Sequence, residues 1–384
     1  MGALNFNERP ILVFWESTRA CLLACKHCRA EAIAQPMPGE LSTEEGFRFI
    51  ESLTAFGRPY PVLIITGGDA LMRDDIFELV AKARSLEIPV GIAPSVTPRL
   101  TDEHIQKLLD LGIKVVSLSL DGATAKTHEG VRGISGHFAD TVLALRRLVK
   151  AGFDVQVNTA VMRDNVRELP ALAELLTEIG VKIWEVFFLI HVGRGKDSQE
   201  ISATECEDVS HLLFEASGYG ITVRTVEAPF FRRVVAERKA ADPQQEATTL
   251  QIFKQFHLSP LYMELSMDLR SRLGPQTTTP KAQTSGTRDG KGIIFISHDG
   301  TVYPAGFLPL PLGNVRTENT ADIYRHHPTL QAIRSGQFDG KCGVCEYHDA
   351  CGGSRSRAFS YTGNPLATDP SCIYEPRNIV LSTT

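Results

Sequence analysis

The chain has 384 residues, a net charge of −5 and 43% apolar residues, values that suit a globular protein with a sizeable core. The negative charge argues against a generic nucleic-acid surface and a polybasic membrane anchor, and no stretch reaches the roughly eighteen apolar residues of a membrane span. The N-terminus lacks the basic-then-apolar pattern of a signal peptide. The sequence therefore predicts a cytoplasmic protein without nucleic-acid or membrane partners.

Short apolar runs rich in Val, Ile and Phe alternate with amphipathic patterns through the first half of the chain. Their nearly continuous apolarity predicts parallel strands buried on both faces, at 11–15, 62–66, 90–93, 115–120, 155–161 and 183–190. Capping signals, such as Ser42 with Glu45, help to place helices at 43–56, 75–86, 102–111, 138–151 and 166–179. Six strand–helix units with short loops predict a partial barrel or an open doubly wound sheet.

Beyond about residue 200 this alternation ends. Helices are predicted at 203–217 and 246–272, and the Gly-, Pro-, Thr- and Ser-rich stretch 274–292 predicts a mobile loop or linker. The run IIFISHDGTVYP then places Asp299-Gly300 between two strand-like segments, which is a strong hairpin signal. The sequence predicts three parts: a barrel, a helical bridge with a linker, and a small α+β domain, at 1–218, 219–290 and 291–384.

Seven of the eight cysteines lie in two tight groups, at 21–28 and 342–372. In a reducing compartment, grouped cysteines are more often metal ligands or catalytic groups than disulfides. Cysteines scattered through a core would not cluster in this way. Cys206 stands alone on a predicted helix, and we expect it to be a structural thiol.

Cys21, Cys25 and Cys28 follow the first predicted strand in the stretch TRACLLACKHCRAEA. A structural zinc site has four ligands. His27 could be the fourth by residue type, but it lies in the sequence between two of these cysteines, Cys25 and Cys28. Thiolates are the usual ligands of iron–sulfur clusters, and a four-iron cluster ordinarily takes four of them. Three thiolates leave one iron with an open coordination site, where a ligand that is not protein can bind.

The spacing Cys-x3-Cys-x2-Cys after a first strand, ahead of six strand–helix units, resembles that of the radical S-adenosylmethionine (SAM) superfamily. The resemblance implies a partial (β/α)6 TIM-like barrel and a [4Fe–4S] cluster on Cys21, Cys25 and Cys28, whose open iron chelates SAM. It also implies an oxidoreductase or lyase that reductively cleaves SAM to a deoxyadenosyl radical, with an electron donor such as flavodoxin or ferredoxin. That radical would abstract a hydrogen atom from the substrate.

Further motifs at the ends of predicted strands match the SAM-binding segments of the superfamily by position. The motif in LIITGGDAL resembles the Gly-Gly-Glu-type segment for the SAM amino group, with Asp in place of the commoner Glu. SLSLDG resembles the segment that reaches the ribose and amino-acid portions, an arginine in HEGVRG resembles the partner of the carboxylate, and HVGRG resembles the turn beside the adenine. The resemblance implies SAM contacts from His27, Gly67, Gly68, Asp69, Ser119, Asp121, Arg132, Val192 and Gly193.

The second cysteine group offers four thiols, which suit a closed zinc site or a fully ligated iron–sulfur cluster. The segment resembles the C-terminal SPASM or shorter Twitch extension of radical SAM enzymes, which holds auxiliary clusters behind a small hairpin. Family cysteines are replaced here by Ala305 in VYPAGF and by Ser354 and Arg355, which should delete one auxiliary cluster. The resemblance therefore implies two [4Fe–4S] clusters in all, the second on Cys342, Cys345, Cys351 and Cys372.

The phrases WESTRACLLACKHCRAEA and CGVCEYHDACGGSRSRAFSYTG are most similar to the branch of alternative heme-synthesis enzymes. There, propionate side chains of an iron tetrapyrrole are oxidatively decarboxylated or removed, which favours a tetrapyrrole substrate here. A tetrapyrrole carries carboxylates, for which the cationic candidates are Arg194, Lys196, Arg232 and Arg233.

Mycofactocin and quinone-cofactor peptide maturases share this architecture, so a ribosomally made peptide, crosslinked or decarboxylated, is the alternative substrate. Only about ten residues precede the first predicted strand, so a separate protein would then have to recognise the peptide leader. A remote alternative from another class is a non-catalytic iron–sulfur or zinc scaffold.

Overall fold

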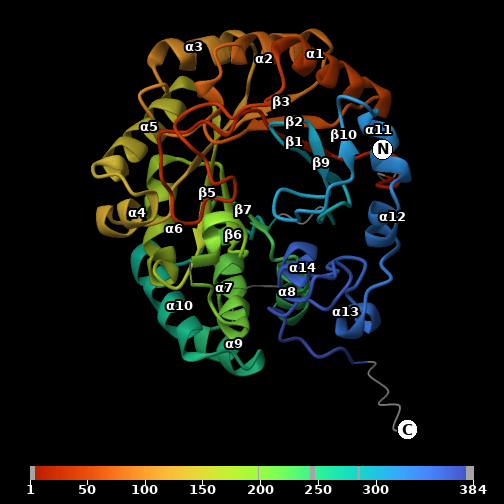
Figure 1. The fold of residues 1–384 in the computed structure, drawn as a ribbon. Coiled ribbons are helices and arrows are strands. Elements are labelled where there is room, and N and C mark those ends of the chain that lie inside the picture. The colour runs from red at the N-terminus through yellow and green to blue at the C-terminus, as the bar shows by residue number, and fades with distance from the viewer. Residues whose placement is uncertain (1–4, 198, 243–246, 283–285, 378–384) are drawn as a thin grey trace.

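The computed structural model describes residues 5–197, 199–242, 247–282 and 286–377. Figure 1 shows a curved sheet in the middle of the molecule with helices around its outer side. The ten strands are ordered β10-β9-β8-β1-β2-β3-β4-β5-β6-β7. Their bounds are Leu12–Glu16 (β1), Val62–Thr66 (β2), Val90–Ile92 (β3), Val115–Ser119 (β4), Asp154–Val161 (β5), Ile183–Phe188 (β6), Thr222–Val226 (β7), Ile293–Ile296 (β8), Thr301–Tyr303 (β9) and Gly313–Asn314 (β10).

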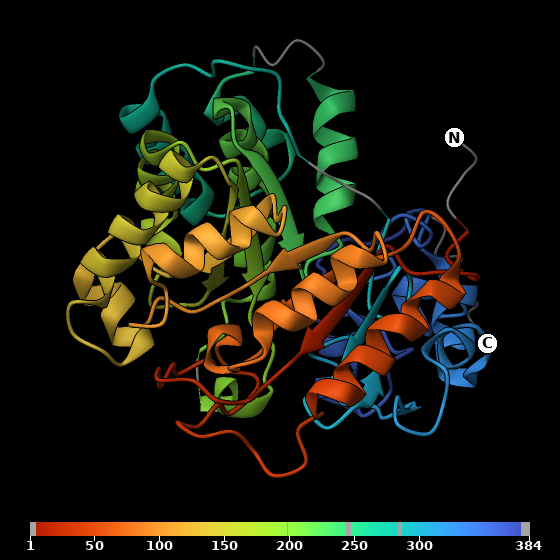
Figure 2. The same ribbon diagram turned by 90° about the horizontal axis from the view of Figure 1, so that it is seen from above.

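Helices connect successive parallel strands from β1 to β7. In the view from above, the red and orange helices of the first third of the chain lie over the strands (Figure 2). The α-helices are Thr43–Ser52 (α1), Ile76–Ser85 (α2), Asp102–Asp110 (α3), Ala125–Arg132 (α4), His137–Ala151 (α5), Leu169–Ile179 (α6), Ala203–Ala216 (α7), Phe231–Ala241 (α8), Thr249–Gln255 (α9), Pro260–Leu273 (α10), Thr320–His326 (α11), Pro328–Ser335 (α12), Gly340–Val344 (α13) and Arg355–Thr362 (α14). The 3-10 helices are Leu53–Phe56, Ala70–Met72, Val166–Glu168, Gly193–Asp197 and Ser217–Tyr219.

All six predicted strands and the hairpin are present, and the predicted α/β partial barrel is confirmed. The expectation that the strands are buried on both faces holds for β3, whose three residues are all buried, and is wrong for the other five. Residues on the outer face, such as Trp15 and Trp184, are at most 1% exposed and pack in the main core, where the Trp15 ring lies 5.3 Å from that of Phe49 on α1. Alternate residues of β2, β4 and β6, which point the other way, remain partly accessible. We call this second side the interior face.

Several elements were not predicted, namely β7, β10, α4, α8 and α11 to α14, and two helices were predicted as one. Strand β7 was missed because TVRTV alternates polar and apolar residues, and helix α8 because its sequence is strongly charged. The predicted helix 246–272 is two helices, α9 and α10. The break falls where His257 adopts a positive φ of 52°, Ser259 caps α10 and Pro260 takes its first position.

The C-terminal hairpin extends the main sheet instead of forming a sheet of its own. Strand β8 pairs in parallel with β1, with Ile293 opposite Leu12, and β9 pairs antiparallel with β8. The predicted linker contains no regular element in its described part, yet it is anchored to the barrel, since the Thr277 and Lys281 N–H groups donate to carbonyl groups of Gly218 and Ser217. The predicted domain boundaries stay predictions.

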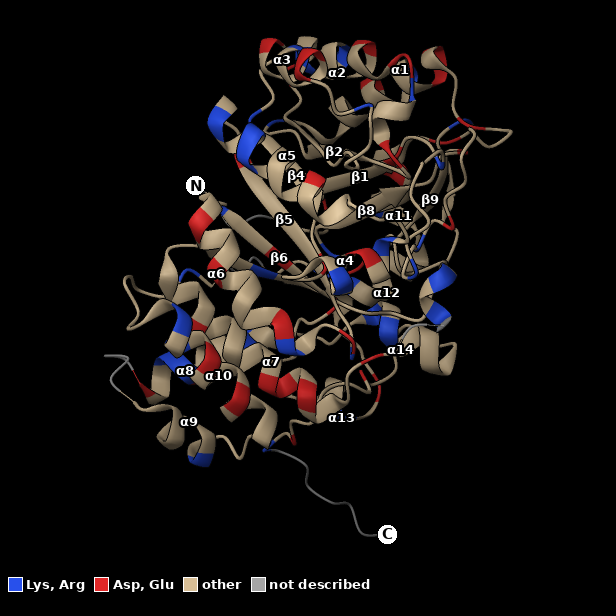
Figure 3. Ribbon diagram, turned by 90° about the vertical axis from the view of Figure 1, so that its left-hand side faces the viewer, with Lys and Arg blue, Asp and Glu red and all other residues tan. Residues whose placement is uncertain are grey.

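Charged residues lie mainly on the helices around the sheet, as the blue and red segments of the ribbon in Figure 3 show. No helix in the described part of the chain combines the length and the apolar character that a membrane-crossing segment needs.

Candidate cluster and SAM site

The three N-terminal cysteines lie together on the loop that follows β1. Cys21 and Cys25 are buried, Cys28 is partly exposed, and all three pack with Leu23 and Ala32. Backbone N–H groups donate to two of the sulfur atoms, from Leu23 to Cys21 at 3.4 Å and from Ala32 to Cys28 at 3.5 Å. Hydrogen bonds to sulfur favour the thiolate form that binds iron. The donor set therefore fits a cluster held by three thiolates.

A buried ion-pair network lies beside Cys25. The guanidinium of Arg132 donates to the Cys25 sulfur at 3.4 Å and pairs with Asp121 at 2.5 Å. The Nε2 atom of His27 lies 2.9 Å from the same carboxylate, whose other oxygen accepts the Ala160 N–H at 2.8 Å. Burial alone would raise the pKa of Asp121, but Arg132 and His27 outweigh it, and the pKa falls far below its usual range. The ionised carboxylate thus holds His27 and Arg132 next to the cysteine loop.

Two histidines that were not predicted, His128 and His137, support this network through hydrogen bonds. The Nδ1 atom of His128 accepts the backbone N–H of Asp121 at 3.1 Å. The proton of the neutral ring is therefore on Nε2, which donates to Nδ1 of His137 at 2.8 Å, and Nε2 of His137 donates to the Val96 carbonyl at 3.0 Å. Burial lowers the pKa of both rings, that of His128 to about 3. The two neutral rings therefore connect Asp121 to the loop after β3 through a chain of hydrogen bonds.

Acid is expected to weaken the fold through His128. Its pKa is about 6.5 in an unfolded chain and about 3 in the folded one. The unfolded chain therefore binds more protons below pH 6.5, so stability falls as the pH falls toward 3. Between pH 7 and pH 5 the free energy of unfolding should fall by about 2 kcal/mol more in the wild type than in His128→Gln. Urea unfolding at both pH values measures this difference. Equal losses would contradict a buried neutral His128.

Gly67 and Gly68 lie against the chain just before the first cysteine. A Cβ atom at Gly67 would lie 2.5 Å from the Thr18 carbonyl oxygen, and one at Gly68 would lie 2.4 Å from that of Ala20. The N–H groups of Gly68 and Asp69 donate to these same two carbonyl groups, each at 2.7 Å. Only glycine permits such a close approach of two backbones. The Gly-Gly-Asp segment therefore fastens the end of β2 to the start of the cysteine loop.

The carboxylate of Asp69 is fully buried and is hydrogen-bonded within the protein. One oxygen accepts the N–H groups of Leu71 and Ser95, both at 3.1 Å, and the other accepts the Thr97 hydroxyl at 2.8 Å. Burial raises its pKa, although these hydrogen bonds oppose the shift. In this structure Asp69 fixes the loop after β3, and its direct contact with the SAM amino group stays a prediction.

The remaining predicted SAM contacts lie where β4 and β6 end. Ser119 is the last residue of β4 and is partly accessible, and Val192 and Gly193 form the turn after β6. Gly193 has a φ of 54°, and a Cβ atom there would lie 2.4 Å from the Arg29 carbonyl oxygen and 2.6 Å from that of Cys28. The structure thus brings this turn, the Gly-Gly-Asp segment and the Asp121 network to one cysteine loop. Their contacts with SAM remain predictions.

Replacing Gly193 by alanine is expected to displace the cysteine loop. The left-handed backbone costs about 1 kcal/mol for alanine, and overlap with a backbone oxygen adds about 1–3 kcal/mol. The melting temperature and the iron content after reconstitution should both fall. The matched control is Gly130→Ala in α4, where a Cβ atom meets nothing within 4 Å and alanine should stabilise the helix slightly. A Gly193 variant with wild-type iron content would show that the loop tolerates the shift.

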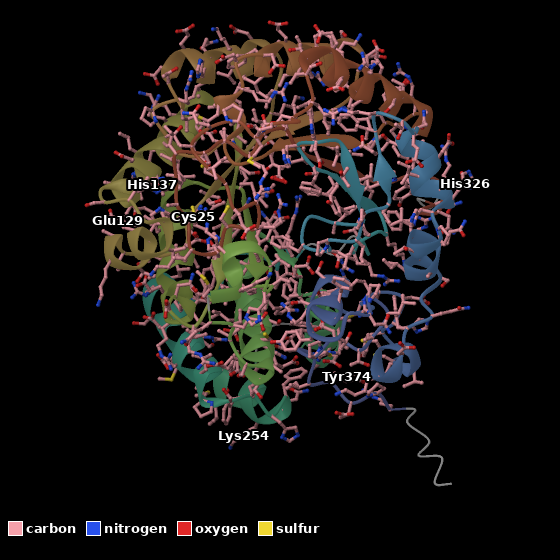
Figure 4. All side chains as sticks on the ribbon, viewed as in Figure 1. Cys25, Glu129, His137, Lys254, His326 and Tyr374 are labelled. Carbon is pink, nitrogen blue, oxygen red and sulfur yellow. The ribbon has the colours of Figure 1, made fainter. Side chains whose placement is uncertain are left out.

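The four C-terminal cysteines surround one small pocket, which is lined by Cys342, Cys345, Cys351 and Cys372 together with Gly353, Thr368 and Tyr374. The N–H of Gly353 donates to the Cys351 sulfur at 3.4 Å, and that of Asp369 to the Cys342 sulfur at 3.5 Å. Figure 4 shows Tyr374 and Cys25 in different parts of the molecule, so the two cysteine groups form separate sites. Four thiols around one pocket fit a fully ligated cluster.

At the positions where the family pattern has further cysteines, this chain has residues that pack in the core or form hydrogen bonds. Ala305 is 6% exposed and packs with Leu308 and Ile333. Ser354 donates to the Glu227 carboxylate, and the fully buried Arg355 donates to carbonyl groups of the 365–367 segment. These side chains leave one four-cysteine site in the C-terminal part.

The predicted cationic side chains do not gather in one cleft. Arg194 donates to the Ala32 carbonyl group beside the cysteine loop, and Lys196 is exposed. Arg232 donates to the Ala350 and Thr287 carbonyl groups, and Arg233 pairs with glutamates of α7 and α8. The last two therefore fix α8 to its neighbours. Side chains that the prediction missed, Arg29 and Arg224, lie on the interior face.

Comparison with known proteins identifies the class. Residues 15–176 match the radical SAM superfamily, and residues 288–351 match the SPASM iron–sulfur cluster-binding domain. The chain belongs to the radical SAM superfamily, and it is a radical SAM enzyme with a C-terminal iron–sulfur domain. Its cofactors are SAM and two [4Fe–4S] clusters, as predicted. The assignment of individual cysteines to these clusters stays a prediction.

Relatives match along almost the whole chain. An AdoMet-dependent heme synthase of Nitratidesulfovibrio vulgaris is 36% identical over 96% of this chain and 93% of its own. Another, from Methanosarcina barkeri, is 33% identical over 97% and 99%. A mycofactocin maturase of Mycobacterium ulcerans is 30% identical over 95% and 88%. The two substrate branches suggested by the sequence are thus both represented.

Solved structures share the fold at low sequence identity. Streptococcus suis SuiB, at 14% identity, gives a TM-score of 0.68 over 96% of this chain and 78% of its own. Native anSMEcpe with bound AdoMet, at 16% identity, gives a TM-score of 0.60 over 94% of this chain and 93% of its own. These matches establish the fold alone.

Proposed function

We propose that this radical SAM enzyme acts on an iron tetrapyrrole and oxidatively decarboxylates its propionate side chains. The observation that carries the proposal is the similarity, over nearly both full lengths, to relatives named AdoMet-dependent heme synthases. In the proposed reaction a propionate loses one hydrogen atom from its β-carbon, one electron and CO2, and a vinyl group remains. The hydrogen atom would leave in deoxyadenosine, and the electron would go to a one-electron acceptor such as an iron–sulfur cluster.

Bound SAM and its cluster would supply the radical that removes a hydrogen atom from an unactivated carbon. The chain's own residues would prepare the site. Cys21, Cys25 and Cys28 would hold the cluster, and Arg132, ionised beside Asp121 and Cys25, would present positive charge to an anionic ligand. The turn at Gly193 would pack against the backbone of Cys28 and so border the site. The four C-terminal cysteines would hold the second cluster.

The setting of the enzyme is part of the proposal. We infer a cytoplasmic protein that receives electrons from a flavodoxin or a ferredoxin. Residues 1–218 would form the catalytic barrel, 219–290 the bridge and 291–384 the auxiliary-cluster domain.

The test is turnover by the anaerobically reconstituted enzyme with SAM, a reductant and iron coproporphyrin III. Deoxyadenosine should form, and the porphyrin should lose the mass of CO2 and two hydrogen atoms per converted propionate. Deoxyadenosine release with unchanged porphyrin would contradict the proposed tetrapyrrole substrate but would still support the radical chemistry. No deoxyadenosine in a fully reconstituted sample would favour the non-catalytic scaffold.

A peptide maturase is the second candidate function, favoured by the 30% identity to a mycofactocin maturase. In that case the substrate would be a ribosomally made peptide, and a separate recognition protein would present it. Conversion of a precursor peptide only when such a protein is added would support this candidate over the tetrapyrrole.

A further inference from the structure

Polar side chains form a band across the interior face. The strand register places Ser119 on β4, Asn158 on β5, Glu185 on β6 and Arg224 on β7 opposite one another on four neighbouring strands. All four are partly accessible, whereas their strand neighbours such as Trp184 are buried against the helices. The band therefore faces the inside of the barrel.

Glu185 and Arg224 form the first of two charge pairs in this region. They are directly opposite in register, and their charges interact. The amide nitrogen of Gln156 donates to the Glu185 carboxylate at 2.9 Å and to the Asn158 side-chain oxygen at 2.8 Å. The glutamate is thus held in place beside the arginine.

Arg29 and Glu16 form the second pair. Arg29 directly follows the last cysteine of the loop, and its two terminal nitrogens donate to one oxygen of Glu16, each at 3.2 Å. Glu16 ends β1 and is 3% exposed, and its other oxygen has no hydrogen-bond partner within the described residues. A buried, unpartnered carboxylate oxygen is costly.

An aromatic turn after β9 contacts Arg29 and reaches strand β6. A Cβ atom at Gly306 would lie 3.4 Å from Nε of Arg29 and 3.2 Å from the Phe295 ring, over which the Arg29 guanidinium lies at 4.5 Å. The next residue, Phe307, has its ring 6.1 Å from that of Phe187 on β6. The interior face therefore carries aromatic side chains together with the two arginines.

We propose that Arg29 and Arg224 bind carboxylate groups of the substrate on the interior face, with Glu16 and Glu185 as positioning residues. This inference rests on the proposed function, because it assigns the two arginines to the propionates of an iron tetrapyrrole. The planar guanidinium matches a carboxylate, and a pair inside a protein is stronger than one in water. Glu16 uses only two of the five N–H groups of Arg29, which leaves donors for a substrate oxygen.

The neighbouring groups suit such a ligand. Aromatic side chains contact the flat apolar ring, while each glutamate neutralises its arginine before the substrate arrives. Burial raises the pKa of Glu185, although Arg224 opposes the shift.

The experiment is an absorbance titration of the reconstituted holoenzyme with iron coproporphyrin III and with its tetramethyl ester. The wild type should bind the free acid, and the ester much more weakly. Arg224→Gln and Arg29→Gln should each raise the Kd for the free acid about tenfold without changing the Kd for the ester. Lysine at either position should restore part of the affinity. The matched control, Arg167→Gln, removes an exposed arginine paired with Glu264 at 3.0 Å and should bind as the wild type does.

Iron content is measured for each variant, since Arg29 adjoins a predicted cluster ligand. Glu16→Gln provides a second variant on that side without altering the cysteine loop, and it should also weaken binding of the free acid. Wild-type affinity in both arginine variants, or equal binding of acid and ester, would overturn the inference and leave the proposed function intact. A wild type that does not bind iron coproporphyrin III would overturn both.

Discussion

Replacing Cys28 by alanine is expected to abolish SAM cleavage and to halve the iron content, from about eight to about four atoms per chain. Two thiolates cannot hold a cluster whose open iron must remain available to SAM. Cys28 is partly exposed and its sulfur accepts the Ala32 N–H at 3.5 Å, so loss of the thiol should leave the surrounding packing largely intact. Deoxyadenosine release and iron content after anaerobic reconstitution measure the effect.

The matched control is Cys206→Ala. This thiol is 2% exposed in α7 and does not line the pocket that the four C-terminal cysteines surround, so we expect it to be a structural thiol and no ligand. The variant should keep both clusters and full SAM cleavage, with a stability loss of about 1–2 kcal/mol from the small cavity. Iron loss in Cys206→Ala equal to that in Cys28→Ala would mean that the loop cysteines are not the ligands.

The cysteine loop and the segments around it could be predicted because their signals are local. Three cysteines within eight positions, the Gly-Gly-Asp motif and the turn at Gly193 each follow a short apolar run. Parallel strands place their carboxyl ends on one edge, so these segments had to meet. The structure shows that meeting directly, through the backbone contacts of Gly68 with Ala20 and of Gly193 with Cys28.

The interior face was not predicted because the many apolar residues of these strands mask the alternation of polar and apolar positions. In IWEVFF, Glu185 interrupts an otherwise apolar strand, and in VQVNTAV the polar Gln156 and Asn158 recur every second residue. A period of two marks a strand with two different faces. That signal was present, and it would have indicated a polar lining inside the barrel.

The hydrogen-bond partners of Asp69 could not be predicted from local sequence patterns. The motif predicts a carboxylate at the end of β2, but only the fold reveals that Ser95 and Thr97 lie within hydrogen-bond distance of it. Likewise, the parallel pairing of β8 with β1 joins segments about 280 residues apart. No local pattern encodes contacts of that kind.

Replacing Asp121 by asparagine is expected to have the largest effect on the fold and the site together. The substitution removes the charge that Arg132 and His27 share, at 2.5 Å and 2.9 Å. Arg132 is 7% exposed and would keep a buried, unbalanced charge, which costs about 3–5 kcal/mol. Urea unfolding and SAM binding by equilibrium dialysis should both reveal the loss.

Asp102→Asn provides the comparison, because Asp102 also pairs with an arginine, Arg147, but on the exposed surface of α3. That variant should change stability by less than about 1 kcal/mol and leave SAM binding as it is. If Asp121→Asn were equally mild, Arg132 would have to be balanced by another group, of which the Cys25 sulfur at 3.4 Å is the nearest described candidate. Since that sulfur is a predicted cluster ligand, the stability loss should then depend on whether the cluster is bound.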